Sequence, residues 1–278
     1  MSPDRSRMIV NTILLLTCLV LIIGLCVFYF YRDPERQITK LDKVILSPAD
    51  GRVVSVRRYM AGVAPALNKG GRDFRVDELA YTGVLGSDGT MISIHISPLD
   101  VHVIRSPADA RIVYLSQIRG GLRFMREKDF EITNERVSIV LETAYGVVGL
   151  VVVGAPIASS VKLLRAMGSR VQAGERIARI RLGSLATVII PDESRLTPSV
   201  SCGNRVLAGV TVLATQSEKP VINEECYTPI KSTFKERLYL VFLAAFAVLK
   251  LTWTMEVCQS VLKHQNYQEF SRLLPLGN

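Results

Sequence analysis

The chain has 278 residues, of which 49% are hydrophobic and 21% are charged, and its mean hydropathy is +0.27. This composition is too apolar for a disordered chain or an ordinary soluble domain, so part of the chain is expected to meet lipid. The length excludes a large multidomain enzyme and allows one domain of roughly 150 to 200 residues plus an addition, or at most two small domains. A net charge of +9 suits anionic phosphates of lipid headgroups or nucleic acid, and charge alone does not choose between them.

The N-terminal region contains a long uncharged segment. Residues Met8–Tyr31 are 24 consecutive uncharged residues, which is long enough to span a bilayer as a helix. A cleaved signal peptide would have a shorter apolar region and a small-residue cleavage site, whereas here aromatic residues run into the charged segment Arg32–Arg36. We therefore predict a retained membrane anchor over residues 1–31. Cations flank both ends, and their larger excess after the segment favours a cytoplasmic location of the following domain.

Between Lys43 and about Thr215 the pattern changes to short runs rich in Val and Ile, separated by Gly, Pro, Asp and Asn. Seven or more such strands with turn signals between them predict a mainly β domain over residues 32–215, a sandwich or partly closed barrel. A short helix is expected around Asp77–Tyr81. The predicted strands include Arg52–Val56, Met91–Ile96, Arg111–Leu115, Arg136–Leu141, Val147–Val153, Arg176–Ile180 and Ala186–Ile190.

Two internal repeats occur in this region. The segment Gly168–Ala178 recurs 35 residues later as Gly203–Ala214. Each copy predicts a turn, a short strand, a second glycine turn and another strand, and these turns resemble those of biotinyl and lipoyl carrier domains. A second echo relates Ser47–Gly51 to Ser106–Ala110, two turns that enter strands. The sequence does not decide between duplication and coincidence for this second pair.

After the β region, a polar linker over Gln216–Lys235 leads into twelve apolar residues, Leu238–Leu249. Twelve residues are too few to span a bilayer, and a longer run would include Lys250. An amphipathic or interfacial helix is therefore expected within the C-terminal extension 216–278, whose role is open.

The cysteines are odd in number and show no metal-ligand spacing. They predict neither a disulfide framework nor a zinc site, so a reducing setting is the default for the domain. The five residues are Cys18, Cys26, Cys202, Cys226 and Cys258.

Histidine is scarce, and one of the three histidines, His102, lies in the segment Ser97–Val103. If this segment is extended, side chains alternate and Asp100 points to the same side as His102. A carboxylate beside an imidazole can orient the ring and hold it as a general base. The structural alternative is a buried histidine whose nitrogens are satisfied by neighbours.

Gly183 and Ser184 lie between two predicted strands. Gly-Ser most often marks a turn, but a serine after a glycine also has the geometry for an intramolecular acyl shift, because glycine leaves its carbonyl accessible to the Ser184 Oγ. The chain has no Gly-x-Ser-x-Gly elbow, His-Glu-x-x-His motif, phosphate loop or dinucleotide fingerprint. This argues against ordinary hydrolases, zinc enzymes and nucleotide-driven enzymes.

Five short motifs follow one another along the chain: Tyr31–Arg36, Ser47–Gly51, Ile96–Val103, Asn134–Arg136 and Arg181–Ser184. In this order the chain from about Phe30 to Ala214 resembles the phosphatidylserine decarboxylase family, in particular its short form with one N-terminal anchor. Two features depart from the family's pattern. Ala110 stands where the family usually has glycine, and residues 216–278 follow the usual end of the domain.

The resemblance implies a self-processing enzyme. In the family the Gly-Ser bond cuts itself, here Gly183–Ser184, and Ser184 becomes a covalent pyruvoyl group. His102 is then expected to activate the hydroxyl and later to reprotonate the substrate carbon, with Asp100 or Asp50 orienting and stabilising the imidazolium. The pyruvoyl carbonyl provides the electron sink that pyridoxal phosphate provides elsewhere.

The implied function is decarboxylation of phosphatidylserine to phosphatidylethanolamine at the cell membrane, in phospholipid biosynthesis, by a lyase made as a zymogen. Arg119, Arg123, Arg126 and Lys128 are candidates for contact with the lipid phosphate, the alternative being a solvated charged face. The expected partners are the anionic phospholipid, the membrane and the two cleavage fragments bound to each other; a homodimer is left open, and nucleic acid is not expected. Two other functions remain: a decarboxylase for another serine-headgroup lipid such as archaetidylserine, and an uncleaved, membrane-anchored binding or adaptor protein built on the carrier-like repeats.

Overall fold

The structure is a computed structural model that describes residues 3–38, 41–68, 70–121, 123–154, 161–180, 184–216, 226–228 and 241. The chain divides into two compact units. One comprises Met1–Tyr29 with Thr233–Asn278, and the other comprises Phe30–Ser232. The C-terminal helix predicted from the sequence lies outside the described residues.

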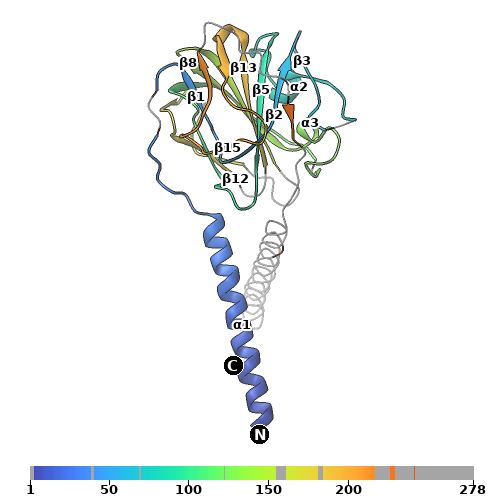
Figure 1. Ribbon diagram of the computed structural model, residues 1–278, viewed down its shortest axis with the longest axis vertical. Helices are drawn as coiled ribbons and strands as arrows, with labels where there is room; N and C mark the ends of the chain where they lie inside the picture. Colours follow the sequence, from blue (N-terminus) through green and yellow to red (C-terminus); the bar gives the residue numbers. More distant parts are fainter. Residues whose placement is uncertain are drawn as a thin grey trace, which may run out of the picture. The chain divides into compact units, whose positions relative to one another are not determined.

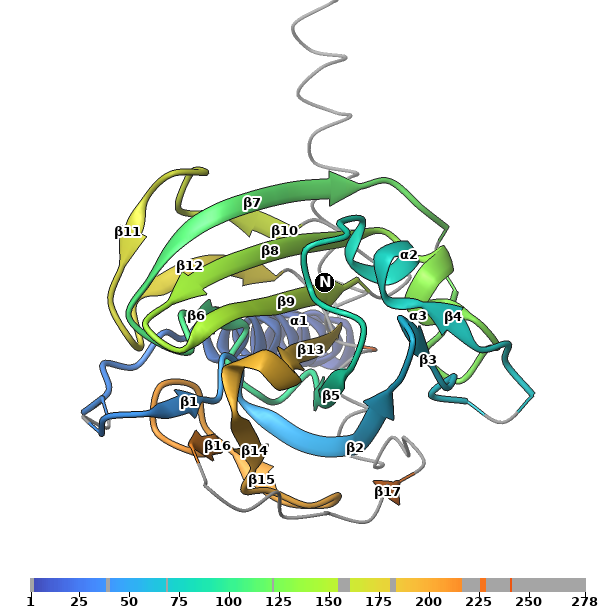
Figure 2. The ribbon, with the colours of Figure 1, turned by 90° about the horizontal axis from the view of Figure 1, so that it is seen from above.

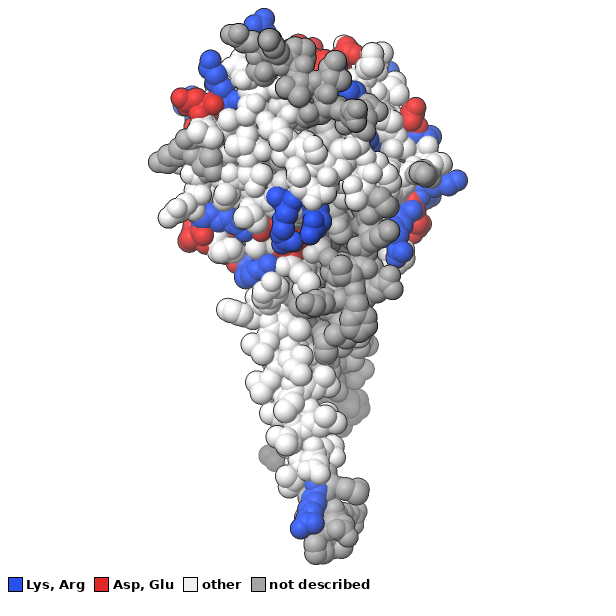
Figure 3. Space-filling model, in the orientation of Figure 1, with Lys and Arg blue, Asp and Glu red and all other residues white. Residues whose placement is uncertain are grey.

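The first unit contains helix α1 (Pro3–Phe30). Its segment Val10–Phe30 has a mean hydropathy of 2.9 and is long and apolar enough to cross a membrane. In the space-filling view blue atoms lie near the N-terminal end of α1, where Arg7 is the one charged residue whose side chain is described, and the described helix beyond it is uncharged (Figure 3). This helix matches the position predicted for the anchor.

The second unit is mainly β, as predicted (Figure 1). Its elements are β1 (Val44–Leu46), β2 (Gly51–Tyr59), β3 (Val63–Ala64), β4 (Phe74–Arg75), α2 (Val76–Ala80), β5 (Gly89–Ile96), β6 (Val103–Arg105), β7 (Ala110–Ile118), α3 (Phe130–Thr133), β8 (Arg136–Thr143), β9 (Gly146–Val153), β10 (Val161–Leu163), β11 (Arg170–Val171), β12 (Arg176–Ile180), β13 (Ser184–Pro191), η1 (Asp192–Ser194), β14 (Leu196–Pro198), β15 (Arg205–Val206), β16 (Val212–Gln216) and β17 (Cys226–Tyr227). All seven strands and the short helix named from the sequence are present.

One large antiparallel sheet dominates this unit. Its strand order is β11-β7-β8-β9-β13-β5-β2-β15, and β17 pairs with the outer side of β2. Figure 2 shows β7, β8, β9, β13, β5 and β2 side by side around a curve, so the sheet is a curled half-barrel. Small sheets of order β1-β16-β14 and β10-β12-β6 accompany it, together with the pair β3-β4.

The large sheet has an internal symmetry, in which each strand counted from one edge has a counterpart at the same place counted from the other edge. β11 corresponds to β15, β7 to β2, β8 to β5 and β9 to β13, while the two three-stranded sheets also correspond. The turns that begin at Ser47 and Ser106 have the same hydrogen bonds: each serine Oγ donates to the alanine carbonyl two residues later at 2.7 Å. The second echo in the sequence is therefore a structural repeat. The glycines of the longer repeat have positive φ angles (Gly168 87°, Gly174 74°, Gly203 87°, Gly209 73°), as its predicted turns require, and the likeness to carrier domains stays a prediction.

The central strand β13 explains how the sheet is buried. All eight of its residues are buried, because one face packs into the large core and the other into a second apolar cluster that includes residues of α2 and α3. Ala186, Val188 and Ile190 face the first cluster, and Leu185 and Ile189 face the second. A run of apolar residues without alternation is typical of such a strand.

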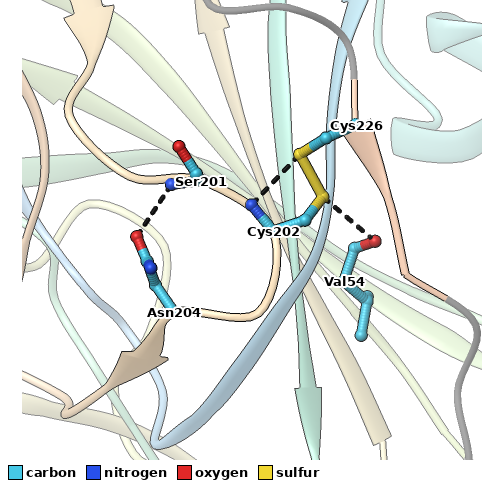
Figure 4. The surroundings of a disulfide bond; sticks show 5 residues. All are labelled: Val54, Ser201, Cys202, Asn204 and Cys226. Carbon is cyan, nitrogen blue, oxygen red and sulfur yellow. Dashed lines mark hydrogen bonds between the residues drawn. A yellow bond between two sulfur atoms is a disulfide. The ribbon is translucent and has the colours of Figure 1, made fainter.

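The structure corrects the expectation for the cysteines. Cys202 and Cys226 form a disulfide, which links the turn before β15 to β17 (Figure 4). The Cys202 Sγ also lies 3.5 Å from the carbonyl of Val54 on β2. The sequence did not predict this pair, because Cys226 lies 24 residues away in a segment whose composition indicates a linker.

Candidate active site

Ser184 is the first residue of β13, at one end of the central sheet, and it pairs with Ile96 at the end of β5. Its side chain is fully buried, and its Oγ has no hydrogen-bond partner among the described residues. Leaving a buried hydroxyl unpaired costs about 1–3 kcal/mol. The Ser55 and Ser138 hydroxyls are also buried without a partner among the described residues, so what distinguishes Ser184 is its place directly after the predicted Gly183–Ser184 bond.

The chain before Ser184 meets the loop that carries His102. Ile180, the last residue of β12, donates its backbone N–H to the carbonyl of His102 at 2.9 Å. On the other side of residues 181–183, Ser184 pairs with Ile96. The residues that flank 181–183, Ile180 and Ser184, therefore contact the two ends of the Ile96–His102 segment. Gly183, predicted at the cleaved bond, lies outside the described residues.

His102 is buried, with only 3% of its surface exposed. Neither ring nitrogen has a hydrogen-bond partner in the described part of the chain, and the ring lies against Phe30 with 4.1 Å between ring centroids. The pKa of His102 is lowered to about 4, chiefly by burial. The backbone and the charge of Asp100 raise this pKa, and the charge of Arg32 lowers it. The imidazole is therefore neutral near pH 7, while burial disfavours the charged form that it takes when it accepts a proton.

The extended geometry expected for Ser97–Val103 is not observed. Residues 98–100 form a turn, in which the Asp100 carboxylate accepts the backbone N–H of Ser97 at 2.9 Å. The other oxygen of Asp100 accepts a hydrogen bond from Arg205 at 2.7 Å. The predicted alternation of Asp100 and His102 is therefore wrong, because the Asp100 carboxylate closes the turn instead of bonding to the ring.

Asp50 lies in the first of the two repeated turns and is also buried. One carboxylate oxygen accepts the backbone N–H of Ala208 at 2.8 Å, and the other accepts a hydrogen bond from Arg36 at 2.7 Å. One backbone donor and one guanidinium therefore hold the Asp50 side chain in place.

The sequence reasoning gave no role to three side chains that contact the predicted site residues. Phe30 lies on His102, Arg36 pairs with Asp50, and Arg205 pairs with Asp100. Phe30 and Arg36 lie at or beside the first family motif, which is the signal that pointed to them. Arg205 lies in the second copy of the glycine-turn repeat, which gave no functional signal.

The predicted basic residues lie in the connection between β7 and α3, at the same end of the sheet as Ser184. Asn134 holds this connection: its side chain accepts the N–H of Arg123 and donates to the carbonyls of Arg123 and Gly154. Arg119 lines a hollow together with Gln117 and Glu135. The Asn134–Arg136 motif therefore has a structural role next to the basic residues.

A buried serine and a neutral buried histidine, whose hydroxyl and ring nitrogens have no hydrogen-bond partner in the described residues, fit the class of enzymes that process their own backbone. Comparison with known proteins gives the family. The family model described as phosphatidylserine decarboxylase matches residues 23–214, which includes Ser184, His102, Asp100 and Asp50. This chain therefore belongs to the phosphatidylserine decarboxylase family.

Similar proteins come from archaea and bacteria. A Methanocaldococcus jannaschii protein named "Putative archaetidylserine decarboxylase proenzyme" is 37% identical over 67% of this chain and 87% of its own length. Proteins named phosphatidylserine decarboxylase proenzyme from Chlorobium luteolum and Zymomonas mobilis are 36% and 35% identical. These matches cover 67% and 68% of this chain and 77% and 71% of the two relatives.

Proposed function

We propose that this chain is a self-processing decarboxylase that converts phosphatidylserine to phosphatidylethanolamine. The observation that carries the proposal is the pair of buried groups without hydrogen-bond partners in the described residues, the Ser184 Oγ and the ring nitrogens of His102. Both lie within the segment that the family model matches, and the word proenzyme in the relatives' names supports a maturation step.

In the proposed maturation, the Ser184 Oγ gives its proton to His102 and attacks the carbonyl carbon of Gly183. The peptide bond is replaced by an ester, and the nitrogen of residue 184 becomes an amine. Removal of the α-proton of residue 184 then breaks the bond between Cβ and the ester oxygen, which releases the Gly183 carboxylate. Water converts the remaining dehydroalanine into a pyruvoyl group and ammonia.

The residues around position 184 suit a group that forms there. The chain enters β13 between β5 and β9, with Ser184 opposite Ile96 and Leu185 opposite Val153, so its backbone is fixed on both sides. When present, a pyruvoyl group supplies a carbonyl that bonds to the substrate amine and draws off the electrons left by departing carbon dioxide. His102 is the group that we expect to hold the proton returned to the substrate carbon, and Asp50 or Asp100 stabilises the charged imidazole.

A second candidate substrate is archaetidylserine, because two relatives from methanogenic archaea, 37% and 32% identical, carry this lipid in their names. Both lipids share the phosphoserine headgroup, and the basic residues Arg119, Arg123, Arg126 and Lys128 are our candidates for its phosphate. Parallel assays of carbon dioxide release from the two lipids separate the candidates. Faster release from archaetidylserine would make that lipid the substrate in place of phosphatidylserine.

We further propose that α1 anchors the enzyme and that the two fragments stay bound to each other; a homodimer remains open. The cations after the helix predict a cytoplasmic β unit, whereas a disulfide is usual in oxidising compartments. A fusion reporter placed after Gln216 decides between these. Activity of the reporter only outside the cytoplasm would contradict the cytoplasmic prediction.

Intact mass under denaturing conditions tests the maturation directly. We expect two pieces, residues 1–183 and residues 184–278, the second with an N-terminus blocked to Edman chemistry. The Ser184→Ala variant is the control and should remain one chain. A single full-length species in folded, membrane-extracted wild-type protein would refute self-processing.

A further inference from the structure

Residues 30–38, here called the strap, connect α1 to the β unit. We propose that the strap forms one wall of the processing site, in which Phe30 is a positioning residue for His102 and Arg36 is a positioning residue for Asp50. The role in cleavage rests on the proposed function, but the contact between Phe30 and His102 can be tested in a chain that does not cut itself.

The strap is fixed to the β unit by a cluster of charges around Asp33. One Asp33 oxygen accepts a hydrogen bond from Arg105 at 3.2 Å. The other accepts hydrogen bonds from Arg176 at 2.8 Å and Arg179 at 3.0 Å. Because Arg105 is in β6 and the other two are in β12, this carboxylate joins the strap to the small sheet that leads directly into the His102 loop.

Apolar packing fixes the other end of the strap. Ile38 lies over Gly174 and Gly209, the second glycines of the two long repeats, and a Cβ at either position would come within 2.9 Å of its side chain. These glycines therefore allow the strap to pass close to both repeats. With both ends held, the residues between them have a defined position.

Phe30 covers one face of the His102 ring. The rings are 4.1 Å apart and tilted by 34°, and only 2% of Phe30 is exposed. The charged groups that act on this imidazole are Asp100, from its own loop, and Arg32, from the strap, which donates to the carbonyl of Leu99 at 2.6 Å. The aromatic ring thus keeps water from a base that has no hydrogen-bond partner in the described structure.

Arg36 makes a similar contact with the other half of the site. Its guanidinium donates to the buried Asp50 at 2.7 Å, and the side chains of both residues are nearly inaccessible, at 11% and 5% exposed. The neighbouring Glu35 differs, because it is 85% exposed and pairs with Arg176 instead. Of these two adjacent residues of the strap, Arg36 therefore contacts the proposed site, whereas Glu35 makes its contact on the surface.

Histidine NMR of the full chain in detergent micelles tests the first contact. In the uncut Ser184→Ala background, the His102 imidazole is expected to titrate with a pKa of about 4. Phe30→Ala should admit water and raise the pKa of His102 toward its ordinary value of about 6.5. Phe30→Leu should keep it low, because leucine retains the apolar bulk, and Phe28→Ala, which removes an exposed ring two residues earlier, should have no effect.

The same substitution has a consequence for cleavage. In a chain with Ser184, refolded from denaturant at a series of pH values, Phe30→Ala should cut up to about 30-fold more slowly at pH 5 than wild type, since less of its imidazole is neutral. The two rates should converge above pH 7. A folded Phe30→Ala variant whose His102 still titrates near pH 4 would overturn the role of Phe30, whatever the chain's cleavage.

Arg36 is tested by the rate of self-cleavage and by conservative rescue. Arg36→Gln should slow cutting by about 10- to 100-fold, because Asp50 loses the group that holds it, and Arg36→Lys should recover most of the rate. Glu35→Gln, the matched control, should cut normally. Wild-type cutting by folded Arg36→Gln would refute the role of Arg36, and equal slowing by Glu35→Gln would show that only the attachment of the strap matters.

Discussion

The turns Ser47–Gly51 and Ser106–Ala110 are built alike in the two halves of the β unit. In each, the aspartate accepts a backbone N–H from an Ala-Gly turn, Asp50 from Ala208 at 2.8 Å and Asp109 from Ala173 at 2.7 Å. Asp50 is buried and paired with Arg36, whereas Asp109 is exposed. Both halves of the fold use this turn, and only the first is one that we propose to serve the candidate site.

The same difference holds at the residue that precedes the strand before each turn. His102 precedes β6 and is buried, while Lys43 precedes β1 and is exposed. The candidate residues thus lie in both halves, and each has a counterpart in the opposite half that serves as an internal control, although Lys43 differs from His102 in having a positive φ of 60°. Four predictions use these controls.

The largest effect is expected for the histidine. His102→Ala should cut itself about 10²- to 10⁴-fold more slowly, because the general base is lost. Lys43→Ala, at the equivalent position, and His95→Ala should still cut. The cut fraction is followed on a gel over time, and circular dichroism confirms that each variant is folded. Normal cutting by folded His102→Ala would remove His102 from maturation.

The glycine that ends the first turn should matter more than its counterpart. Gly51 has φ +154°, and a Cβ there would lie 2.1 Å from the carbonyl oxygen of His95. Gly51→Ala should therefore lower the free energy of unfolding by about 3 kcal/mol or more. Ala110→Gly should cost only about 0.5–1 kcal/mol. Denaturant unfolding of the uncut Ser184→Ala chain measures both, and equal costs would contradict the difference between the turns.

The disulfide gives the third comparison, because Cys202 corresponds to Met167 in the other half, 35 residues earlier. Cys202→Ser should lower the free energy of unfolding by about 3 kcal/mol, since the closed loop is lost from the unfolded state. Met167→Ser, which changes an exposed side chain, should have little effect. Maleimide labelling before and after reduction reports the bond itself. Reaction of Cys202 without reductant in the folded protein would show that the bond is absent.

The smallest effect is expected for the paired aspartates. Asp50→Asn and Asp109→Asn keep the shape of the turns, so loss of charge is the main change in each. Asp50→Asn should slow self-cleavage by about 10- to 100-fold, and Asp109→Asn should stay within twofold of wild type. Equal rates for the two variants would mean that the charge of Asp50 is not used.

The sequence predicted the parts of the fold whose signal is local. Strand Arg176–Ile180 was predicted with its observed bounds, and the run Ala186–Ile190 marked β13, because apolar residues between turn signals identify buried strands. It did not separately identify short strands such as β1 and β6, which have three residues each. Such strands exist through pairing with distant segments, and a local pattern does not encode that pairing.

The site follows the same rule. Ser184 and His102 were found from short motifs, and the structure places both in buried positions. The orientation of Asp100 was not predicted, since the turn at residues 98–100 replaces the assumed strand. The contacts of Phe30 and Arg36 were also missed, because each joins residues that only the folded chain brings together. The domain limits 1–31, 32–215 and 216–278 remain predictions.

The position of β13 in the sheet determines what a cut before Ser184 leaves behind. β13 lies between β5 and β9, which belong to the other fragment, and β15 and β16 pair with β2 and β1 of that fragment. Neither fragment then has the complete large sheet, although the small sheet β10-β12-β6 lies wholly within residues 1–183. The uncut chain is the form that can reach this arrangement by folding from the unfolded state. The two chains of the mature enzyme, once they are separated by denaturant, should not reassemble. Maturation should therefore make denaturation of this protein irreversible.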